Sequence, residues 1–209
     1  MSKVLVLNSS VLGEASVSRV LVREALDRLR EENATLSVVE RDLGTAPVPH
    51  LSGDATAAVK GGSNANDAQR AALALSDELI AELQAADIVV IGAPMYNFGI
   101  ASNLKAWFDY VLRAGVTFRY TEAGAQGLVT GKRVIVIETR GGFYSEGPTR
   151  IMDSQEPHLR TLLGFIGITD VTFIRAEKLA FGPDARDEAV VGAKAALAKL
   201  AHSHLGVNA

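Results

Sequence analysis

The sequence contains no cysteine, few aromatic residues and almost no excess of one charge. The absence of cysteine excludes disulfide bonds, thiolate-bound zinc, iron–sulfur clusters and a cysteine nucleophile. Lysine and arginine number 21 against 24 aspartate and glutamate, and this formal net charge of -3 argues against a nucleic-acid partner. The longest stretch without a charged residue, 88–104, is too short and too interrupted to span a membrane, so no membrane partner is expected.

The residues that are present suit one folded domain. Hydrophobic residues make up 48% of the 209 positions and charged residues 22%, which is typical of a packed chain and not of a disordered one. At this length we expect a single domain that spans residues 1–209. The first residues lack the apolar region and cleavage site of a signal peptide, so we expect a cytoplasmic protein.

Five β-prone segments of two kinds predict a parallel sheet. Val4–Leu7, Ile88–Ile91 and Val134–Ile137 are uninterrupted aliphatic runs, which are typical of strands buried on both faces. Leu36–Asp42 and Val171–Arg175 contain polar residues. These two segments therefore suit the edges of the sheet, where one side meets water.

Helical patterns separate the strands, as an α/β fold requires. Ser18 is the expected cap of the first helix, which extends to about Glu32. Further helices are predicted at 67–86, 103–113, 157–166 and 183–200. With the polar strands at the edges, the simplest right-handed arrangement is a doubly wound five-stranded parallel sheet of order 2-1-3-4-5, the flavodoxin-like order.

Two segments do not fit this alternation. Residues 44–62 are rich in glycine and proline and are long for a connection, so we expect a flap, an irregular cover or partial disorder. Val116–Tyr120 and Leu128–Thr130 flank a turn that contains Gly124 and Gly127. This pattern predicts a small hairpin inserted before the fourth strand.

The loop after the first strand has the composition of a phosphate site. In this strand order a ligand binds beyond the carboxyl ends of the first and third strands. Ser10, Ser16, Val17 and Ser18 lie there, at the expected start of a helix. Hydroxyl groups and free amide groups at a helix N-terminus suit a phosphate monoester. The segment matches neither the dinucleotide-binding glycine motif nor the P-loop, and serines that only cap a helix are an equally good interpretation.

The loop after the third strand is aromatic, with Met95, Tyr96, Asn97 and Phe98 in succession. Two aromatic rings and a thioether provide an apolar floor for a flat ring, and exposed amide groups are able to meet its heteroatoms. A strand-to-helix turn with buried aromatic residues is the alternative interpretation of the same loop.

The loop after the fourth strand contains Thr139, Arg140, Gly141 and Gly142. Paired glycines let a ligand approach the backbone, and Arg140 is suited to stabilise a reduced ring or a phosphate. A tight turn with a solvated arginine is the alternative. Together, a phosphate loop, an aromatic loop and a glycine loop at neighbouring strand ends indicate a mononucleotide with a planar ring, namely FMN.

Several motifs resemble those of the FMN-dependent NADH-azoreductase family, which is related to NAD(P)H:quinone oxidoreductases. They are Met-Tyr-Asn-Phe at 95–98, Leu-Lys-Ala-Trp-Phe-Asp at 104–109, Gly-Val-Thr-Phe-Arg-Tyr-Thr at 115–121, Arg-Gly-Gly at 140–142 and Leu-Gly-Phe-Ile-Gly-Ile at 163–168. The chain departs from the family at Val17, where glutamine is frequent, and at Thr139, where serine is frequent.

The resemblance implies an enzyme with one non-covalent FMN per subunit, which oxidises NADH and reduces quinones and aromatic azo compounds by a ping-pong mechanism. It places Ser10 and residues 16–18 at the phosphate and ribityl end of FMN, residues 95–98 at the isoalloxazine ring, and residues 139–142 at the opposite edge of that ring. No catalytic side chain is implied, because N5 of the flavin carries the chemistry. The family also implies a homodimer, in which Phe118 and Tyr120 reach across to the substrate.

Two other classes of function stay open. A flavodoxin-type electron carrier without its own small-molecule substrate would be strongly acidic to dock basic partners, and a net charge of -3 is weak support for it. A binding or regulatory module could use the fold without redox turnover. The four histidines do not have metal-ligand spacing, so no metal site is predicted.

Overall fold

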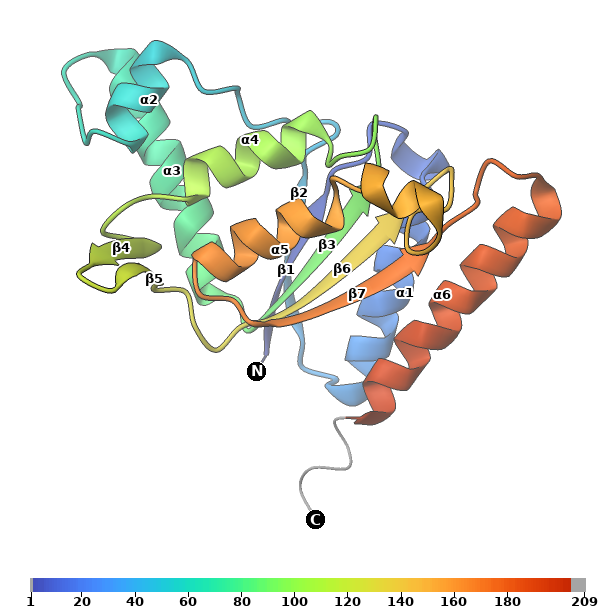
Figure 1. Ribbon diagram of the computed structural model, residues 1–209. Helices are drawn as coiled ribbons and strands as arrows, with labels where there is room; N and C mark the ends of the chain where they lie inside the picture. The colour runs from blue at the N-terminus through green and yellow to red at the C-terminus, as the bar shows by residue number, and fades with distance from the viewer. Residues whose placement is uncertain (1, 204–209) are drawn as a thin grey trace.

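The computed structural model describes residues 2–203, with side chains described up to residue 200, and it has a parallel β-sheet at its centre (Figure 1). The sheet contains, in spatial order, β2 (Ser37–Asp42), β1 (Lys3–Asn8), β3 (Ile88–Pro94), β6 (Arg133–Thr139) and β7 (Asp170–Ala176). All four pairings are parallel. The predicted order 2-1-3-4-5 is therefore confirmed, with β6 and β7 as the fourth and fifth strands of the sheet.

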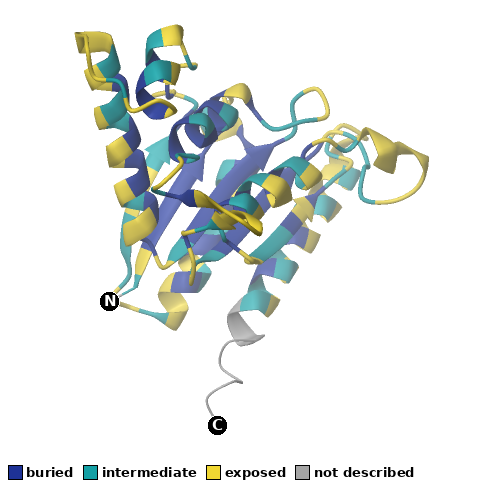
Figure 2. Ribbon diagram, turned by 60° about the vertical axis from the view of Figure 1, so that its left-hand side comes forward, coloured by how far each residue is buried: buried dark blue, intermediate teal, exposed yellow. Residues whose placement is uncertain are grey.

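The burial of the strands explains this order. β1, β3 and β6 are almost completely buried along their length, whereas β2 and β7 are partly exposed. Figure 2 shows the buried residues concentrated in the centre of the sheet. Aliphatic runs thus occupy the positions covered on both faces, and the more polar strands occupy the edges.

Helices cover both faces of the sheet. They are α1 (Val17–Glu32), α2 (Gly53–Val59), α3 (Asp67–Ala85), α4 (Ser102–Val111), α5 (Glu156–Phe165) and α6 (Pro183–Ser203), with short 3₁₀ turns η1 (Gly13–Ala15) and η2 (Pro148–Met152). One apolar core joins the sheet to α1 and α6, and a second joins it to α2, α3, α4 and α5. Within residues 2–203, no helix has both the length and the hydrophobicity needed to cross a membrane.

A glycine brings the first helix close to the central strand. A Cβ atom at Gly92 in β3 would lie 3.0 Å from Cγ2 of Val22 in α1 and 3.1 Å from Oδ1 of Asn8 in β1. Any larger residue would push α1 away from the sheet. The absence of a side chain here therefore sets how near the start of α1 lies to the ends of β1 and β3.

The first helix begins earlier than its sequence suggested. Ser16 has an extended backbone (φ -77, ψ 125), and its side chain accepts a hydrogen bond from the amide of Arg19. Ser16 is therefore the N-cap, and the prediction that Ser18 caps the helix is wrong. Ser18 is the second residue of α1, and its hydroxyl lies 2.9 Å from that of Ser16.

The segment 44–62 is more regular than expected, because it contains α2. Ser52 caps this helix by accepting a hydrogen bond of 3.1 Å from the amide of Ala55. Ala55, Ala58 and Val59 are buried in the core that includes α3. The short apolar face of α2 gives too little helical periodicity to be recognised in the sequence.

The predicted hairpin is present, but its second strand was misplaced. β4 (Phe118–Thr121) pairs with β5 (Gly124–Gly127), so the turn lies before Gly124 and not between Gly124 and Gly127. Gly124 adopts a φ of 111°, a left-handed conformation that glycine tolerates immediately after a tight turn. Leu128–Thr130 leaves the hairpin, and Val129 donates a hydrogen bond of 2.8 Å to the carbonyl of Ile166.

Candidate active site at the carboxyl ends of the strands

The loop after β1 presents unpaired amide groups at the start of α1. Within residues 2–203, the amide N–H groups of Ser10, Val17 and Ser18 donate to no protein acceptor. The hydroxyl of Ser10 accepts a hydrogen bond of 3.2 Å from Leu12, which folds the loop back on itself. The positive end of α1 and these free donors form an arrangement suited to an anion.

Arg19 belongs to this loop region, although sequence reasoning did not select it. Its guanidinium donates to Oδ2 of Asp42, at the end of β2, over 2.7 Å. Its Nε is buried without a hydrogen-bond partner among the described residues. A cation in the first turn of a helix opposes the helix dipole, and this unfavourable position was the signal available in the sequence. Arg19 adds positive charge where the amide groups of α1 are free.

The loop after β3 is a tight turn with an unusual backbone. Tyr96 and Gly99 exchange two backbone hydrogen bonds of 3.0 and 3.1 Å, and the two residues between them, Asn97 and Phe98, have φ of 47° and 72°. Positive φ at both central residues corresponds to a type I′ turn, which normally favours glycine or asparagine. A phenylalanine in this conformation is strained, and such strain is concentrated at functional sites. No protein acceptor among the described residues takes the amide N–H of either central residue.

A cavity of about 290 Å³ lies between the first two loops. Val11, Tyr96, Asn97 and Asn103 contribute to its wall. The hydroxyl of Tyr96 accepts a hydrogen bond of 3.3 Å from the amide of Val11, which ties the two loops together. This cavity is the space in which a ligand would meet the loop after β1, the aromatic turn and the start of α4.

Asn103, near the start of α4, is a second residue that sequence reasoning missed. Its Nδ2 donates to the carbonyls of Ser9 (3.1 Å) and Leu43 (2.9 Å), which fixes the loops after β1 and β2. Its Oδ1 is buried in the cavity wall and has no hydrogen-bond partner among the described residues. A buried acceptor without a partner is costly, and a ligand hydroxyl would satisfy it. The sequence offered no signal, because one asparagine in a helix is unremarkable.

The loop after β6 begins with an arginine that is fully buried. Nε of Arg140 donates to Gln155 (2.9 Å), Nη1 to Glu177 (3.2 Å) and Nη2 to Glu138 (2.6 Å). Oδ2 of Asp153 lies 3.1 Å from Nη2. Both interpretations made from the sequence, a ligand contact and a solvated turn, are thereby corrected. The guanidinium is already engaged by partners inside the protein.

The partners of Arg140 connect it to the other loops of the site. Nε2 of Gln155 donates to the carbonyl of Ala93, the next-to-last residue of β3 before the aromatic loop (2.8 Å). Oε1 of Glu177 accepts the amide groups of Tyr144 (2.8 Å) and Ser145 (3.1 Å). Arg140 therefore acts as a hub that fixes the backbone on both sides of the glycine loop, while the amide groups of Gly141 and Gly142 have no protein acceptor among the described residues.

Two carboxyl groups of this hub have opposite pKa shifts. Burial raises the pKa of Glu138 to about 8, because the attraction of Arg140 is offset by desolvation and by the neighbouring Glu156 and Asp153. Burial also acts to raise the pKa of Glu177, but hydrogen bonds from Ser145, Tyr144 and Arg140 outweigh it, so the pKa is lowered. Glu138 also has a buried oxygen, Oε1, without a partner among the described residues. The hub therefore contains one carboxyl that keeps its proton near neutral pH.

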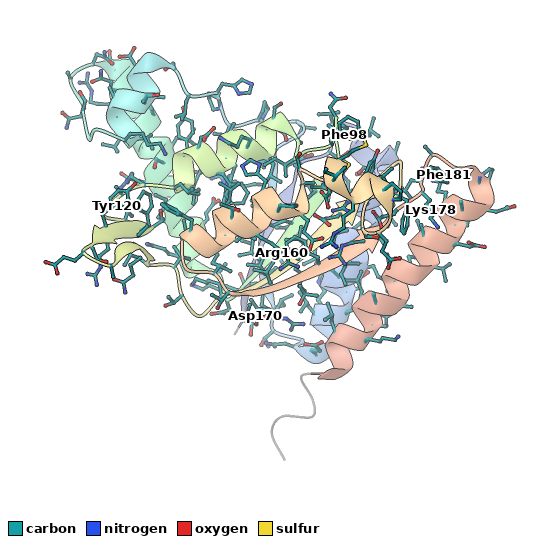
Figure 3. All side chains as sticks on the ribbon, in the orientation of Figure 1. Phe98, Tyr120, Arg160, Asp170, Lys178 and Phe181 are labelled. Carbon is teal, nitrogen blue, oxygen red and sulfur yellow. The ribbon has the colours of Figure 1, made fainter. Side chains whose placement is uncertain are left out.

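The remaining predicted residues are distributed over two distant parts of the molecule. Met95 and Thr139 lie at the strand ends, where the amide of Met95 donates to the carbonyl of Thr139 (2.9 Å). Phe118 and Tyr120 lie on the hairpin, and Figure 3 places Tyr120 far from Phe98, at the other end of α4. Phe118 is buried, with its ring centre 4.6 Å from that of Phe165, so the prediction that it reaches across to another subunit is wrong. Tyr120 is 74% exposed.

These groups fit FMN by the chemistry of their free atoms. Amide donors and Arg19 suit the phosphate, the unpaired Oδ1 of Asn103 suits a ribityl hydroxyl, and the amide groups at 97–98 and 141–142 suit the heteroatoms of the ring. Phe98 is 42% exposed and Tyr144 stands edge-on to it, with ring centres 6.0 Å apart. The two rings form an apolar border beside the crevice.

Comparisons with known proteins show the family of this chain. Residues 2–201 match the family described as having a flavodoxin-like fold. A protein of Hyphomonas neptunium named FMN-dependent NADH:quinone oxidoreductase is 56% identical over 203 residues, which are 97% of each chain. One of the same name from Escherichia coli O6:H1 is 52% identical over 94% of this chain and 97% of its own.

Solved structures give the same result. An azoreductase of Bacillus anthracis is 30% identical, with a TM-score of 0.87, and the match covers 97% of this chain and 100% of that one. A B. anthracis FMN-dependent NADH-azoreductase in complex with FMN is 26% identical, with a TM-score of 0.83, over 96% and 100% of the two chains. The chain belongs to the flavodoxin-like fold family and, within it, to the FMN-dependent NADH:quinone oxidoreductases.

Proposed function

We propose that this chain is an FMN-dependent enzyme that oxidises NADH and reduces quinones, and that it also cleaves aromatic azo compounds. The observation that carries the proposal is the set of unpaired donors at three neighbouring strand ends: Ser10, residues 17–18, residues 97–98 and residues 141–142. A flavin mononucleotide has acceptors for such donors in its phosphate and in the heteroatoms of its ring. The relatives named above, at about half identity over nearly the whole chain, support the same activity.

In this assignment each loop binds a different part of the cofactor. Ser10, Ser16, Val17 and Ser18 hold the phosphate and the ribityl end, through hydroxyl and amide donors. Met95, Tyr96, Asn97 and Phe98 contact the isoalloxazine ring, and Thr139, Gly141 and Gly142 border its opposite edge. Arg140 does not bind the cofactor through its guanidinium; it keeps the glycine loop in place.

Bound FMN would supply hydride transfer, which carries two electrons from NADH on to the acceptor. The protein's own task is to bind, orient and exclude water. The hydrogen bond from Val11 to the Tyr96 hydroxyl closes the crevice on one side. Phe98 and Tyr144 form the apolar border on another. No nucleophile or proton-transfer side chain is required in this scheme.

One exposed ring face would serve the donor and the acceptor in turn, which implies ping-pong kinetics. A quinone accepts two electrons in one turnover, whereas reduction of an azo bond to two amines takes four electrons and therefore two turnovers. Parallel lines in double-reciprocal plots, with NADH varied at several menadione concentrations, are the expected result. Intersecting lines would show that both substrates bind together.

A second copy of the chain is proposed to complete the site. Tyr120 is exposed at the tip of the hairpin and lies far from the strand ends of its own chain (Figure 3). In a homodimer it is placed to cover the substrate in the partner's crevice. Sedimentation should show a dimer, and the Tyr120→Ala variant should raise the KM for menadione. We also propose a cytoplasmic location, where NADH is available.

The function is tested by reconstitution and rapid kinetics. The purified protein, loaded with FMN, is mixed with NADH in a stopped-flow instrument, and then with menadione or methyl red. Loss and recovery of the flavin absorbance at a rate that matches steady-state turnover is the expected result. Reduction without reoxidation by any small acceptor would favour an electron carrier, and a protein that takes up no FMN would favour a binding module.

A further inference from the structure

A second, larger cavity lies next to the crevice, on the far side of the glycine loop. Its volume is about 470 Å³, and it is bounded by η2, the first turns of α5, the end of β7 and the loop at 144–146. Tyr144 lines this cavity and also meets Phe98 of the aromatic turn edge-on. The ring pair of Phe98 and Tyr144 therefore links the aromatic turn to the cavity, and a ligand whose ring lies beside Phe98 would extend past Tyr144 to reach it.

Two arginines of the cavity wall share one carboxylate. Nη2 of Arg160 lies 2.7 Å from Oε1 of Glu156, and Nη2 of Arg175 lies 2.6 Å from Oε2 of the same residue. Arg160 is held further by the ring of Phe173, whose centre lies 4.3 Å from its guanidinium carbon. Glu156 thus holds both guanidinium groups in position, and Nε of Arg175 also lies 3.7 Å from Oε2 of Glu138.

The wall contains three arginines and three carboxylates, so its charges balance in number, but they are not paired one to one. Asp153 is paired with Arg140, which lies behind the wall, and it accepts amide hydrogen bonds from Gln155 (2.9 Å) and Glu156 (3.2 Å). Arg150, on η2, has no ion pair among the described residues. Of the three carboxylates in the wall, Asp153 and Glu156 are paired with other arginines, and Glu146 is not. An unpaired guanidinium in a cavity is suited to bind a phosphate.

We propose that this arginine cavity binds the diphosphate of NADH, with Arg150 and Arg160 as the contacting residues. The inference rests on the proposed function, because it needs the nicotinamide ring in the crevice beside Phe98. NADH carries two negative charges on its diphosphate, whereas a quinone carries none. The cavity therefore lowers the KM for the donor and contributes nothing to the binding of the acceptor.

The proposal is tested by removing the phosphates from the donor and the charge from the protein. Steady-state rates with menadione are measured for NADH and for dihydronicotinamide riboside, which has the same reactive ring and no phosphate. In Arg150→Ala, the ratio of the KM for NADH to the KM for the riboside should rise about tenfold, as for the loss of one charge-assisted hydrogen bond. Glu146→Gln should lower the same ratio, because it removes a negative charge from the rim. Arg30→Ala, on the distant last turn of α1, serves as the matched control and should leave the ratio unchanged.

The outcomes separate the proposal from the function on which it rests. A wild-type ratio that rises with salt, and a lower salt dependence in Arg150→Ala, would support the cavity assignment. If Arg150→Ala changes both KM values equally, or neither, the assignment is overturned while the oxidoreductase function stands. If neither donor reduces the FMN-loaded protein, the proposed function and the cavity assignment both fail.

Discussion

The loops after β1 and β6 lie on either side of β3, and they differ in whether their polar groups have partners inside the protein. The first contains neutral serines and leaves the amide groups of Ser10, Val17 and Ser18 without protein acceptors. The second contains a cation and carboxylates, but Arg140 is 0% exposed and its donors are engaged by protein groups. The comparison teaches that a ligand is bound by the groups that folding leaves unsatisfied, and not by the most strongly charged residue near the strand ends.

The largest expected effect comes from breaking the hub. Arg140→Met leaves the carboxylates of Asp153 and Glu177 without their counter-charge and the buried Glu138 without its donor, so it should lower the free energy of unfolding by about 3–5 kcal/mol. Urea unfolding of the cofactor-free protein, followed by circular dichroism, measures this. Arg30→Met, at an exposed position of α1, should change it by less than about 0.5 kcal/mol. Equal values for the two variants would show that Arg140 is not a structural hub.

The protonated carboxyl of the hub predicts a specific pH dependence. The pKa of Glu138 is raised from 4.5 to about 8, so between these values the folded protein holds a proton that the unfolded chain has lost. Stability therefore falls as the pH rises through this window, and the loss ends above the folded pKa. Between pH 6 and 7.5, the free energy of unfolding of the wild type should fall by about 2 kcal/mol relative to that of Glu138→Gln. Urea unfolding of the two proteins at several pH values measures this difference. If their free energies of unfolding change with pH by the same amount, the pKa of Glu138 is not raised.

A smaller effect distinguishes the role of Ser16 in capping from its role in binding. Ser16 caps α1 beside the site, and Ser52 caps α2 outside it. Replacement of either by alanine should cost about 1 kcal/mol of stability, as for other N-caps. Only Ser16→Ala should weaken the binding of FMN, by about fivefold, because a hydroxyl contact to the phosphate is lost. Fluorescence titration with FMN compares the two variants, and an equal loss of affinity would remove Ser16 from the site.

An effect of similar size on stability concerns the strained turn after β3. Asn97 has a φ of 47°, which glycine adopts freely and alanine does not. Asn97→Ala should therefore lower the free energy of unfolding by about 1 kcal/mol, while Asn97→Gly should lower it little. Both variants should reduce bound FMN more slowly with NADH if the side chain contacts the ring. Unchanged stopped-flow rates in both would leave only the backbone of this residue in the site.

The sequence predicts the sheet well, because its signal is local. Aliphatic runs such as Val4–Leu7 mark buried strands wherever they occur, and the more polar Leu36–Asp42 marks an edge. The sequence also identifies the three loops, since parallel strands end at one edge. The positive φ of Phe98 could not be foreseen, because nothing in its residue type favours that conformation.

The role of Arg140 lay beyond sequence reasoning for a different reason. Its partners Glu138, Gln155 and Glu177 come from three separate segments, and only the folded chain brings them together. From the sequence alone, an arginine beside paired glycines is a reasonable ligand contact. Asn103 was missed in the same way, because its unpaired Oδ1 becomes visible only when the other hydrogen bonds are known.

The free amide of Val17 allows a direct test of where the phosphate lies. Val17 is the first residue of α1, a position where proline is tolerated, and the extended backbone of Ser16 is the conformation that a following proline prefers. Val17→Pro therefore removes one N–H donor without disturbing the helix. Val17→Ala keeps the donor and serves as the control for lost side-chain packing.

Titration of the three proteins with FMN and with riboflavin is the decisive measurement, because riboflavin lacks only the phosphate. We predict that Val17→Pro binds FMN about tenfold more weakly than the wild type and Val17→Ala do, with riboflavin affinity alike in all three. If Val17→Pro retains its full affinity for FMN, or loses affinity for both flavins equally, the phosphate does not lie at the start of α1.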